Sequence, residues 1–431
     1  MKVGSYFPGQ QAKNFFAISA DDCLLHFAED EWNEKQRLDD TANKDLIAML
    51  QVGSLFIANP QDHVSLYDGF TTPEWQKMLA FYHDSFQRLG LSPAPLSNVH
   101  YYPREGFYQS VAEDSQAADT ELVTIYMISG SNQQLHAGSN ALEISRHVNS
   151  KMRLAESAEE YNLPVPVSMI CHKHELASAH VAEFFAKYDN QIILKVMGLA
   201  GARNVTPVQS PQEGLEYLAE FSDDIEIVLQ EKLSSDEFTE MTVDLFVSDT
   251  EVKIDNIRKI LFSDGLWVGN YINRGFELSK AQQQVLIKVG EYAREQGYSQ
   301  PQGQNCGIDF FIKGDEVVVI EINARWTGGL IPAQMIQRLD LDTVDTVTSF
   351  DMVSKDRLDN YLAFLDEYRY GQSDADFSIV PLGFSPYLYE LEGVWKTHVW
   401  EMIIGDYEAF KVIKNEVMGA NELMVADTIT L

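Results

Sequence analysis

Basic residues are scarce in this chain, which has 32 Lys and Arg against 65 Asp and Glu and a formal net charge of −33. Binding to nucleic-acid phosphates or to anionic membranes requires a basic surface, so the composition argues against both kinds of partner. The negative charge does not identify a partner, because a high net charge often serves only solubility. A bound nucleotide would need local lysines and arginines that act against the overall field.

Cysteines and long apolar runs are also few. Cys23, Cys171 and Cys306 lie far apart and form no metal-binding or disulfide pattern, which favours free thiols in a reducing compartment. No apolar run approaches the roughly 18 residues that a membrane helix needs. The segment Met1–Gly4 opens no signal-peptide pattern. We therefore expect a cytoplasmic protein.

What the chain does have is length and apolar content. Its 431 residues are more than one hydrophobic core usually organises, and they suffice for two to four packed units. With 45% apolar and 11% aromatic residues it can bury such cores, so a globular protein is expected. We find no internal repeat. The polar stretch Gly130–Asn140 reads as a loop or a domain junction.

Residues 1–120 suggest an α/β unit, and the pattern becomes sharper from about residue 150. Ser210, followed by Pro211 and by Glu213 three residues after the serine, predicts a capped helix that runs to about Phe221. Residues 341–431 contain helical and strand-like pieces that the sequence does not order. The other expected elements are strands at 121–129, 191–196 and 225–231, an antiparallel pair at 240–248 and 251–255, helices at 151–161 and 279–297, and a hairpin of 307–312 with 317–324.

The most informative of these is the hairpin strand that ends in the letters E-I-N-A-R. Side chains alternate along a strand, so Glu321, Asn323 and Arg325 share one face. A carboxylate, an amide and a guanidinium together suit Mg²⁺ bridged to phosphates. Asp309 or Asp315 is expected to supply a second carboxylate. Asp309 meets the Glu321 face only if the hairpin loop has an odd number of residues, which we predict. A solvated edge strand is the alternative.

Two further features favour a nucleotide. Lys195 lies in the apolar run 191–196, before the glycine-bearing stretch 198–204, and burying it requires an anion such as a phosphate. A lysine that reaches solvent from the strand end is an equal alternative. Downstream, a strand closes at 230–233 and Glu237 follows a polar turn, a common place to bind adenine and ribose. An ordinary exposed turn fits the same residues.

The order of these pieces, from about 150 to 335, resembles the ATP-grasp superfamily. The spacing from Lys151 to Leu163-Pro164 and the phrase E-K-L-S-S-D-E-F-T are similar to D-alanine–D-alanine ligases. The long N-terminal part and a distinct C-terminal piece look more like ATP-grasp peptide ligases of the pheganomycin type. The resemblance implies an α/β (α+β) protein with the ATP-grasp fold. Its expected parts are an N-terminal pre-ATP-grasp α/β domain at 1–145, the nucleotide-binding and catalytic core at 146–340, and a C-terminal extension or cap at 341–431.

The resemblance also implies a role for each matching residue. Lys151 and Lys195 would hold the ATP phosphates under a mobile loop that contains Gly198 and Gly201. Asp309, Glu321 and Asn323 would bind Mg²⁺, with Mn²⁺ as an alternative metal. The adenine hinge would be Glu231, Lys232 and Leu233, with Glu237 on the ribose.

One position departs from the pattern. D-alanine–D-alanine ligases place an arginine two residues before the aspartate that matches Asp309, and this chain has Gly307. Stabilisation of the reacting oxyanion would then fall to Arg325, Arg274 or Arg258. Many family members also use glutamate where Asp309 stands, a conservative change for magnesium.

The implied activity is an ADP-forming ligase that activates a carboxylate as an acyl phosphate and joins it to an amine. A thiol, hydroxyl or ammonia acceptor is a second reading, and a non-catalytic ATP-binding regulator is a third. The expected partners are small molecules, an amino acid, peptide or other carboxylate together with an amine. A homodimer remains open. His172, His174 and His180 suggest a metal site only weakly, and surface histidines fit them better.

Overall fold

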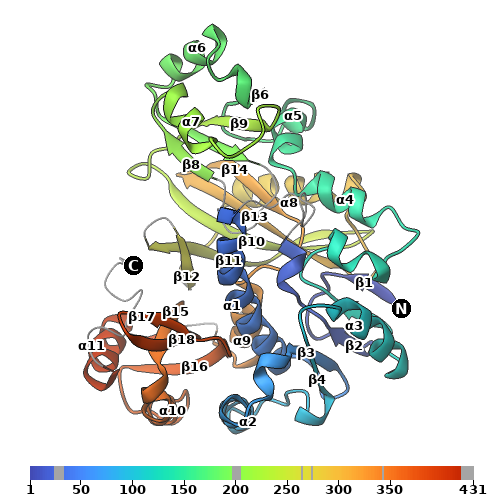
Figure 1. Ribbon diagram of the computed structural model, residues 1–431, viewed down its shortest axis with the longest axis vertical. Helices are drawn as coiled ribbons and strands as arrows, with labels where there is room; N and C mark the ends of the chain where they lie inside the picture. Colours follow the sequence, from blue (N-terminus) through green and yellow to red (C-terminus); the bar gives the residue numbers. More distant parts are fainter. Residues whose placement is uncertain (24–33, 197–204, 264–265, 273–274, 342–343, 419–431) are drawn as a thin grey trace.

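The computed structural model describes residues 1–431 except 24–33, 197–204, 264–265, 273–274, 342–343 and 419–431. Three sheets organise the described chain, and Figure 1 shows them in sequence colours. Among the described helices, none combines the length and the apolar character that crossing a membrane requires. Short 3₁₀ turns occur at Ala20–Cys23, Asp68–Thr71, Leu96–Asn98, Gly130–Leu135, Lys173–Glu175 and Lys355–Arg357.

The N-terminal unit is a parallel five-stranded sheet in the order β1-β5-β2-β3-β4. Its strands are β1 (Lys2–Gly4), β2 (Asn14–Phe16), β3 (His63–Tyr67), β4 (Val99–Tyr102) and β5 (Leu122–Thr124). Its helices are α1 (Glu34–Ile57), α2 (Pro73–Arg88), α3 (Phe107–Ala117) and α4 (Ala141–Val148). The predicted strand 121–129 was too long, since regular pairing stops at Thr124, although the Ile125 N–H still donates to the Gly4 carbonyl over 3.0 Å.

A small antiparallel sheet in the order β6-β9-β7-β8 stands at the top of Figure 1. It consists of β6 (Ser168–His172), β7 (Ile192–Val196), β8 (Val205–Val208) and β9 (Glu226–Glu231), with helices α5 (Lys151–Tyr161), α6 (Ala179–Lys187) and α7 (Pro211–Tyr217). The prediction for α5 is confirmed, and α7 begins at the expected serine cap, where Ser210 accepts from the Glu213 N–H. Helix α7 stops earlier than predicted, at Tyr217.

The large antiparallel sheet runs β14-β13-β10-β11-β12-β15-β18-β16, with β17 paired to β18. It therefore joins the predicted carboxylate hairpin to strands from the C-terminal 90 residues. The strands are β10 (Thr239–Val247), β11 (Val252–Ser263), β12 (Leu266–Ile272), β13 (Gln304–Lys313), β14 (Glu316–Asn323), β15 (Thr346–Ser354), β16 (Phe377–Phe384), β17 (Tyr389–Leu391) and β18 (Val394–Gly405). The helices are α8 (Lys280–Glu295), α9 (Leu330–Arg338), α10 (Leu358–Glu367) and α11 (Tyr407–Met418).

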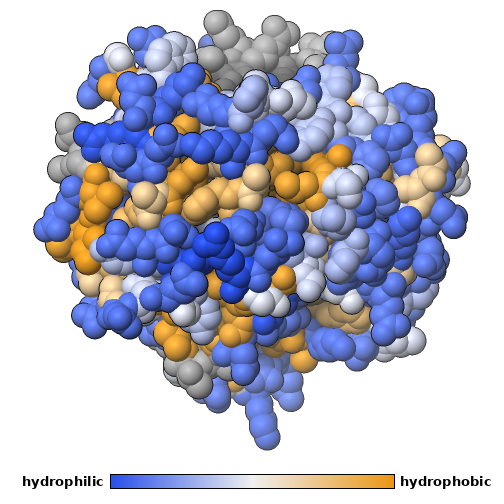
Figure 2. All heavy atoms as spheres, turned by 90° about the horizontal axis from the view of Figure 1, so that it is seen from below, coloured by the Kyte–Doolittle hydropathy of each residue, from blue (hydrophilic) through white to orange (hydrophobic). Residues whose placement is uncertain are grey.

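Among the described residues, the apolar side chains form three cores, and the largest is shared by the N-terminal unit and the C-terminal segment. Helix α1 runs between these two parts (Figure 1) and contacts β3, β16 and α9. The contact with β16 is close, because a Cβ on Gly383 would lie 2.4 Å from the Met49 carbonyl oxygen. The surface seen from below is mostly hydrophilic, with a broken apolar band across it (Figure 2).

Candidate functional site

The two predicted metal-binding carboxylates meet on one face of the β13–β14 hairpin. Asp309 and Glu321 are directly paired, so their side chains lie on the same face, as predicted. The reason differs from the prediction. The turn itself has two residues, Gly314 and Asp315, and the odd residue is a bulge at Ile320. Asp315 is exposed in the turn, so it is not the second carboxylate of this face.

The other two motif residues are linked to the same face. The Asn323 amide donates to the Asp309 carboxylate over 2.8 Å and accepts from Arg325 over 2.6 Å. Arg325 also donates to the Tyr126 hydroxyl over 2.7 Å and is only 8% exposed. Arg325 therefore ties the hairpin to the loop that follows β5. β14 is the edge strand of its sheet, but Asn323 and Arg325 are buried, so solvation does not explain these two residues.

The electrostatics of the two carboxylates differ. Burial, and then repulsion from Glu321, raises the pKa of Asp309 to about 6. Burial also acts to raise the pKa of Glu321, but the charge of Lys151 and then Arg325 outweighs it and holds that pKa below its ordinary value. The Asp309 and Glu321 carboxylates therefore repel each other, and a bound cation would relieve that repulsion.

Lys151 and Lys195 reach this face from two different elements. The Lys151 ammonium, at the start of α5, forms an ion pair with Glu321. The Lys195 ammonium, from β7, lies 3.5 Å from the carbonyl of Ile320 at the bulge. Lys195 is 6% exposed, so it does not reach solvent from the strand end. Burial, and then the charge of Lys151, lowers the pKa of Lys195 to about 8.

Glu240 is a member of the site that the sequence did not reveal. Burial, and then repulsion from Asp309, raises its pKa to about 7, while Lys195 acts to lower it. Its strand, β10, pairs with β13, and alternation puts Glu240 on the same face as Thr242, which bonds to Asp309. The register of β10 against β13 is the signal that would have found it.

The predicted hinge lies where β9 ends. The Lys232 N–H donates to the Gln191 carbonyl over 3.0 Å, and the Glu231 carboxylate accepts from the Val167 N–H over 2.9 Å. Within the described part of the chain, the Leu233 N–H has no hydrogen-bond partner. The backbone beyond β9 therefore keeps a donor available.

Glu237 follows the hinge, but its side chain is paired with a residue outside the hinge. Its carboxylate forms an exposed ion pair with Lys313 at 2.6 Å. The structure thus leaves Glu237 near the turn of the β13–β14 hairpin rather than beside Asp309 and Glu321.

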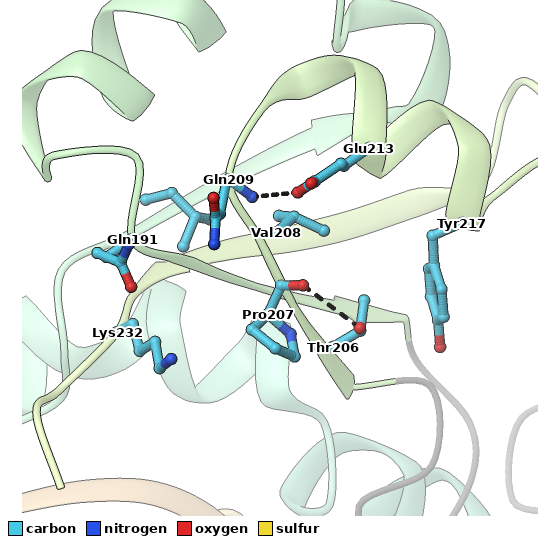
Figure 3. A pocket seen from close by; sticks show the side chains of 9 residues that line it. Gln191, Thr206, Pro207, Val208, Gln209, Glu213, Tyr217 and Lys232 are labelled. Atoms are coloured by element: carbon cyan, nitrogen blue, oxygen red, sulfur yellow. Dashed lines mark hydrogen bonds between the residues drawn. The ribbon is translucent and has the colours of Figure 1, made fainter.

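A cavity of about 300 Å³ opens along the edge of the small sheet, and Figure 3 shows its lining. It shares Gln191 and Lys232 with the hinge, and the Glu213 carboxylate closes one side by accepting from the Gln209 N–H over 2.5 Å. The face that carries Asp309 and Glu321, called the acidic face below, does not line this cavity. Its lining residues are Gln191, Ile192, Thr206, Pro207, Val208, Gln209, Glu213, Tyr217 and Lys232.

Gly198, Gly201 and Arg274 lie outside the described residues. His172 and His174 each bond a backbone carbonyl of the turn before β9. Cys171 and Cys306 are buried free thiols.

The donors on the acidic face fit magnesium. No group of three or more His, Cys, Asp and Glu side chains within the described ranges is placed to hold a metal ion. Magnesium does not require one, because it usually takes one or two carboxylates and fills the remaining positions with phosphate oxygens and water. Asp309 and Glu321 are two hard oxygen donors on one face, and their mutual repulsion favours a cation between them.

Sequence comparisons give no match, neither to a family model nor to a curated protein. Solved structures do match. Phosphoribosylamine–glycine ligase from Thermotoga maritima superposes with a TM-score of 0.54 at 12% identity, covering 93% of this chain and 96% of that chain. The N5-carboxyaminoimidazole synthetase of Staphylococcus aureus, complexed with ADP, gives 0.53 at 10% identity, covering 96% and 98%.

The biotin carboxylase domain of the Hydrogenobacter thermophilus 2-oxoglutarate carboxylase, solved with MgADP and bicarbonate, gives 0.55 at 12% identity, covering 94% of this chain and 89% of that chain. At these identities the likeness concerns the fold. The mixed α/β architecture, with the predicted order of elements around the carboxylate hairpin, is therefore an ATP-grasp fold.

Proposed function

We propose that this chain is an ADP-forming ligase that activates a carboxylate as an acyl phosphate and joins it to an amine. The observation that supports this most directly is the convergence of Lys151 and Lys195 on the carboxylate face of Asp309 and Glu321. A buried lysine, Lys195, and a half-buried one, Lys151, beside two half-buried carboxylates suit a polyphosphate accompanied by a divalent metal.

In this proposal Asp309, Glu321 and Asn323 hold Mg²⁺, with Mn²⁺ as an alternative, and Lys151 and Lys195 hold the ATP phosphates. Mg·ATP supplies the transferable phosphoryl group and an electrophilic phosphorus. Asn323 would share its amide oxygen, which now accepts from Arg325. The hinge at 231–233 would receive adenine through the free Leu233 N–H. Glu237 remains the proposed ribose ligand and would have to exchange Lys313 for it.

The residues of the chain act mainly by positioning and charge neutralisation. The Lys195 ammonium lies in a nearly water-free setting, where its attraction to a phosphate would be stronger than in solvent. Arg325 is held by Tyr126 and Asn323, so its guanidinium is pre-organised beside the carboxylates to spread charge that develops on the transferring group. The substrate carboxylate first attacks the γ-phosphorus and ADP leaves, which forms the acyl phosphate. The amine then attacks the acyl carbon, loses a proton and displaces phosphate, giving the amide.

Glu240 extends the proposed site. Its carboxyl lies close enough to Asp309 and Lys195 for their charges to shift its pKa, and it has no ion pair among the described residues. We propose that it balances Lys195 when the phosphates are absent.

The proposed organisation keeps an N-terminal pre-ATP-grasp unit at 1–145, the core at 146–340 and a C-terminal cap at 341–431, in a cytoplasmic protein. Within the fold, the E-K-L-S-S-D-E-F-T phrase supports a core like that of D-alanine–D-alanine ligases. The long flanking parts support a peptide ligase of the pheganomycin type.

The test incubates the protein with Mg·ATP and a pool of amino acids and dipeptides, and identifies nucleotide and condensed products by mass spectrometry. The proposal predicts ADP and a new amide from the wild type and neither from Glu321→Gln. Near wild-type turnover in that variant would remove the metal assignment. Release of AMP would refute the acyl phosphate route.

A further inference from the structure

The strand that carries Glu321 and Asn323 leaves its sheet just before the arginine of the motif. The pairing of β14 with β13 ends at Asn323, which lies opposite Gly307. The backbone N–H of the next residue, Ala324, lies beyond this pairing, although Ala324 is only 1% exposed. A buried N–H group without an acceptor is costly, so this position needs a hydrogen-bond partner from elsewhere in the chain.

The side chain of Asn149 supplies that partner. Its Oδ1 accepts from the Ala324 N–H over 2.9 Å. Its Nδ2 donates to the Ser145 carbonyl over 2.8 Å and lies 3.4 Å from the Ala324 carbonyl. The amide group is therefore fixed on both sides. Asn149 is the C-cap of α4, so these contacts attach that helix to the end of the motif strand.

The contact with Ser145 connects Asn149 to the N-terminal unit. Ser145 is 1% exposed, and its hydroxyl donates to the Ile128 carbonyl over 2.8 Å. Two residues before Ile128, the carbonyl of Tyr126 accepts from the Trp326 N–H over 2.9 Å. The end of the motif strand is therefore held on both sides, by Asn149 and by Tyr126.

The same segment carries one of the two lysines of the site. Only Ser150 separates Asn149 from Lys151, and the Ser150 hydroxyl caps α5 by accepting from the Arg153 N–H over 3.2 Å. Lys151 is the first residue of that helix, and its ammonium pairs with Glu321. The junction of α4 and α5, on the right of Figure 1, therefore contacts the motif strand at two places.

The place of the Lys151 ammonium depends on where its backbone is held, because a lysine side chain is long and flexible. Asn149 holds that backbone two residues away. Resting on the proposed ligase function, we propose that Asn149 is a positioning residue for Lys151. It keeps the ammonium beside Glu321 until a nucleotide phosphate takes it.

This role has opposite consequences for metal and for nucleotide. In the nucleotide-free protein, Lys151 occupies an oxygen of Glu321 that the proposed metal would use. Loosening Lys151 should therefore strengthen metal binding to the empty protein and weaken nucleotide binding, because the phosphate contact becomes less frequent. A general loss of structure would weaken both. The direction of the two changes separates positioning from a merely structural role.

The test uses the full-length protein and the variants Asn149→Ala and Asn149→Ser, which both remove the amide. The electron paramagnetic resonance signal of free Mn²⁺ gives the metal affinity without nucleotide, and calorimetry with Mg²⁺ gives the ADP affinity. Each variant is also made in a Lys151→Met background. Asn140→Ala is the matched control, because exposed Asn140 is at the other end of α4 and its side chain makes no capping hydrogen bond.

Both Asn149 variants should bind Mn²⁺ about three- to tenfold more tightly and ADP about three- to tenfold more weakly than the wild type. In the Lys151→Met background the same substitutions should change either affinity by less than about twofold, because the residue that they act through is gone. Asn140→Ala should bind both ligands as the wild type does.

Unchanged affinities, a fall in both affinities, or equal effects with and without Lys151 would each overturn the positioning role. Loss of the folded state in both variants, seen by circular dichroism, would overturn it as well. The wild type separates this proposal from the proposed function. If the wild type does not bind ADP, the proposed function fails, whereas ADP binding that is unchanged in the Asn149 variants removes only the positioning role.

Discussion

The ion pair between Lys151 and Glu321 leads to a prediction about metal binding in the absence of nucleotide. The two side chains are only 10% and 19% exposed, and the lysine occupies one carboxylate oxygen that the proposed metal would use. A free divalent ion must therefore displace Lys151, whereas a nucleotide phosphate would draw the lysine away. Metal should bind the empty protein weakly and bind together with nucleotide tightly.

Lys151→Met tests this competition. A hydrogen bond between charged groups contributes about 1.5–3 kcal/mol, and every 1.4 kcal/mol is about tenfold in affinity. Removing the lysine should therefore strengthen Mn²⁺ binding to the nucleotide-free protein by about 10- to 100-fold. The same variant should bind ADP more weakly, because it lacks a phosphate contact.

The assay follows the electron paramagnetic resonance signal of free Mn²⁺ during titration, with and without ADP. Glu321→Gln should abolish the tight binding and so locate it. Lys173→Met is the matched control, since Lys173 is a buried lysine that pairs with Asp223 away from this face. Equal Mn²⁺ affinity in the wild type and Lys151→Met would refute the competition.

Three other outcomes are expected. Lys195→Ala should weaken ATP binding by about 10- to 100-fold in calorimetry, because a buried cation is lost from the phosphate site. Burial raises the pKa of Asp22 from 3.8 to about 7, so the folded protein keeps a proton that the unfolded chain loses. The free energy of unfolding should therefore fall by up to about 4 kcal/mol as the pH rises from about 4 to about 7. Asp22→Asn should lack this loss in urea titrations. Gly383→Ala should cost about 1–3 kcal/mol by crowding the Met49 carbonyl, whereas Gly130→Ala, with open space around it, should be nearly neutral in thermal denaturation.

Each of these three predictions has an outcome that would contradict it. Unchanged nucleotide affinity would remove Lys195 from the phosphate site. An equal pH dependence in wild type and Asp22→Asn would show that this carboxyl does not control acid stability. A neutral Gly383→Ala would show that α1 and β16 are not in close contact.

The local elements were largely predictable because their signals lie within a few residues. The serine cap at Ser210 and the left-handed Asn162 that ends α5 are satisfied by the backbone next to them. The Asp309–Glu321 pairing was also predictable, but its cause was not. A bulge at Ile320 depends on how the strand meets Lys195 and the segment before β6, and both are distant in sequence.

Longer-range features could not be predicted. Glu240 belongs to the site only through the register of β10 against β13, and no local pattern encodes which strands are neighbours. The strands after residue 341 joined the same sheet as the hairpin because β15 pairs with β12. Periodicity shows which face of an element is buried, but not which partner covers it.

The acyl phosphate is the central claim, and oxygen transfer tests it most directly. The protein is incubated with Mg·ATP and a pool of amino acids and dipeptides carrying ¹⁸O in their carboxylates, and the released phosphate is analysed by mass spectrometry. The account predicts one ¹⁸O atom in the phosphate formed with each new amide, because the carboxylate oxygen that attacks phosphorus leaves with it. Amide formation with unlabelled phosphate, or with AMP and pyrophosphate, would contradict it.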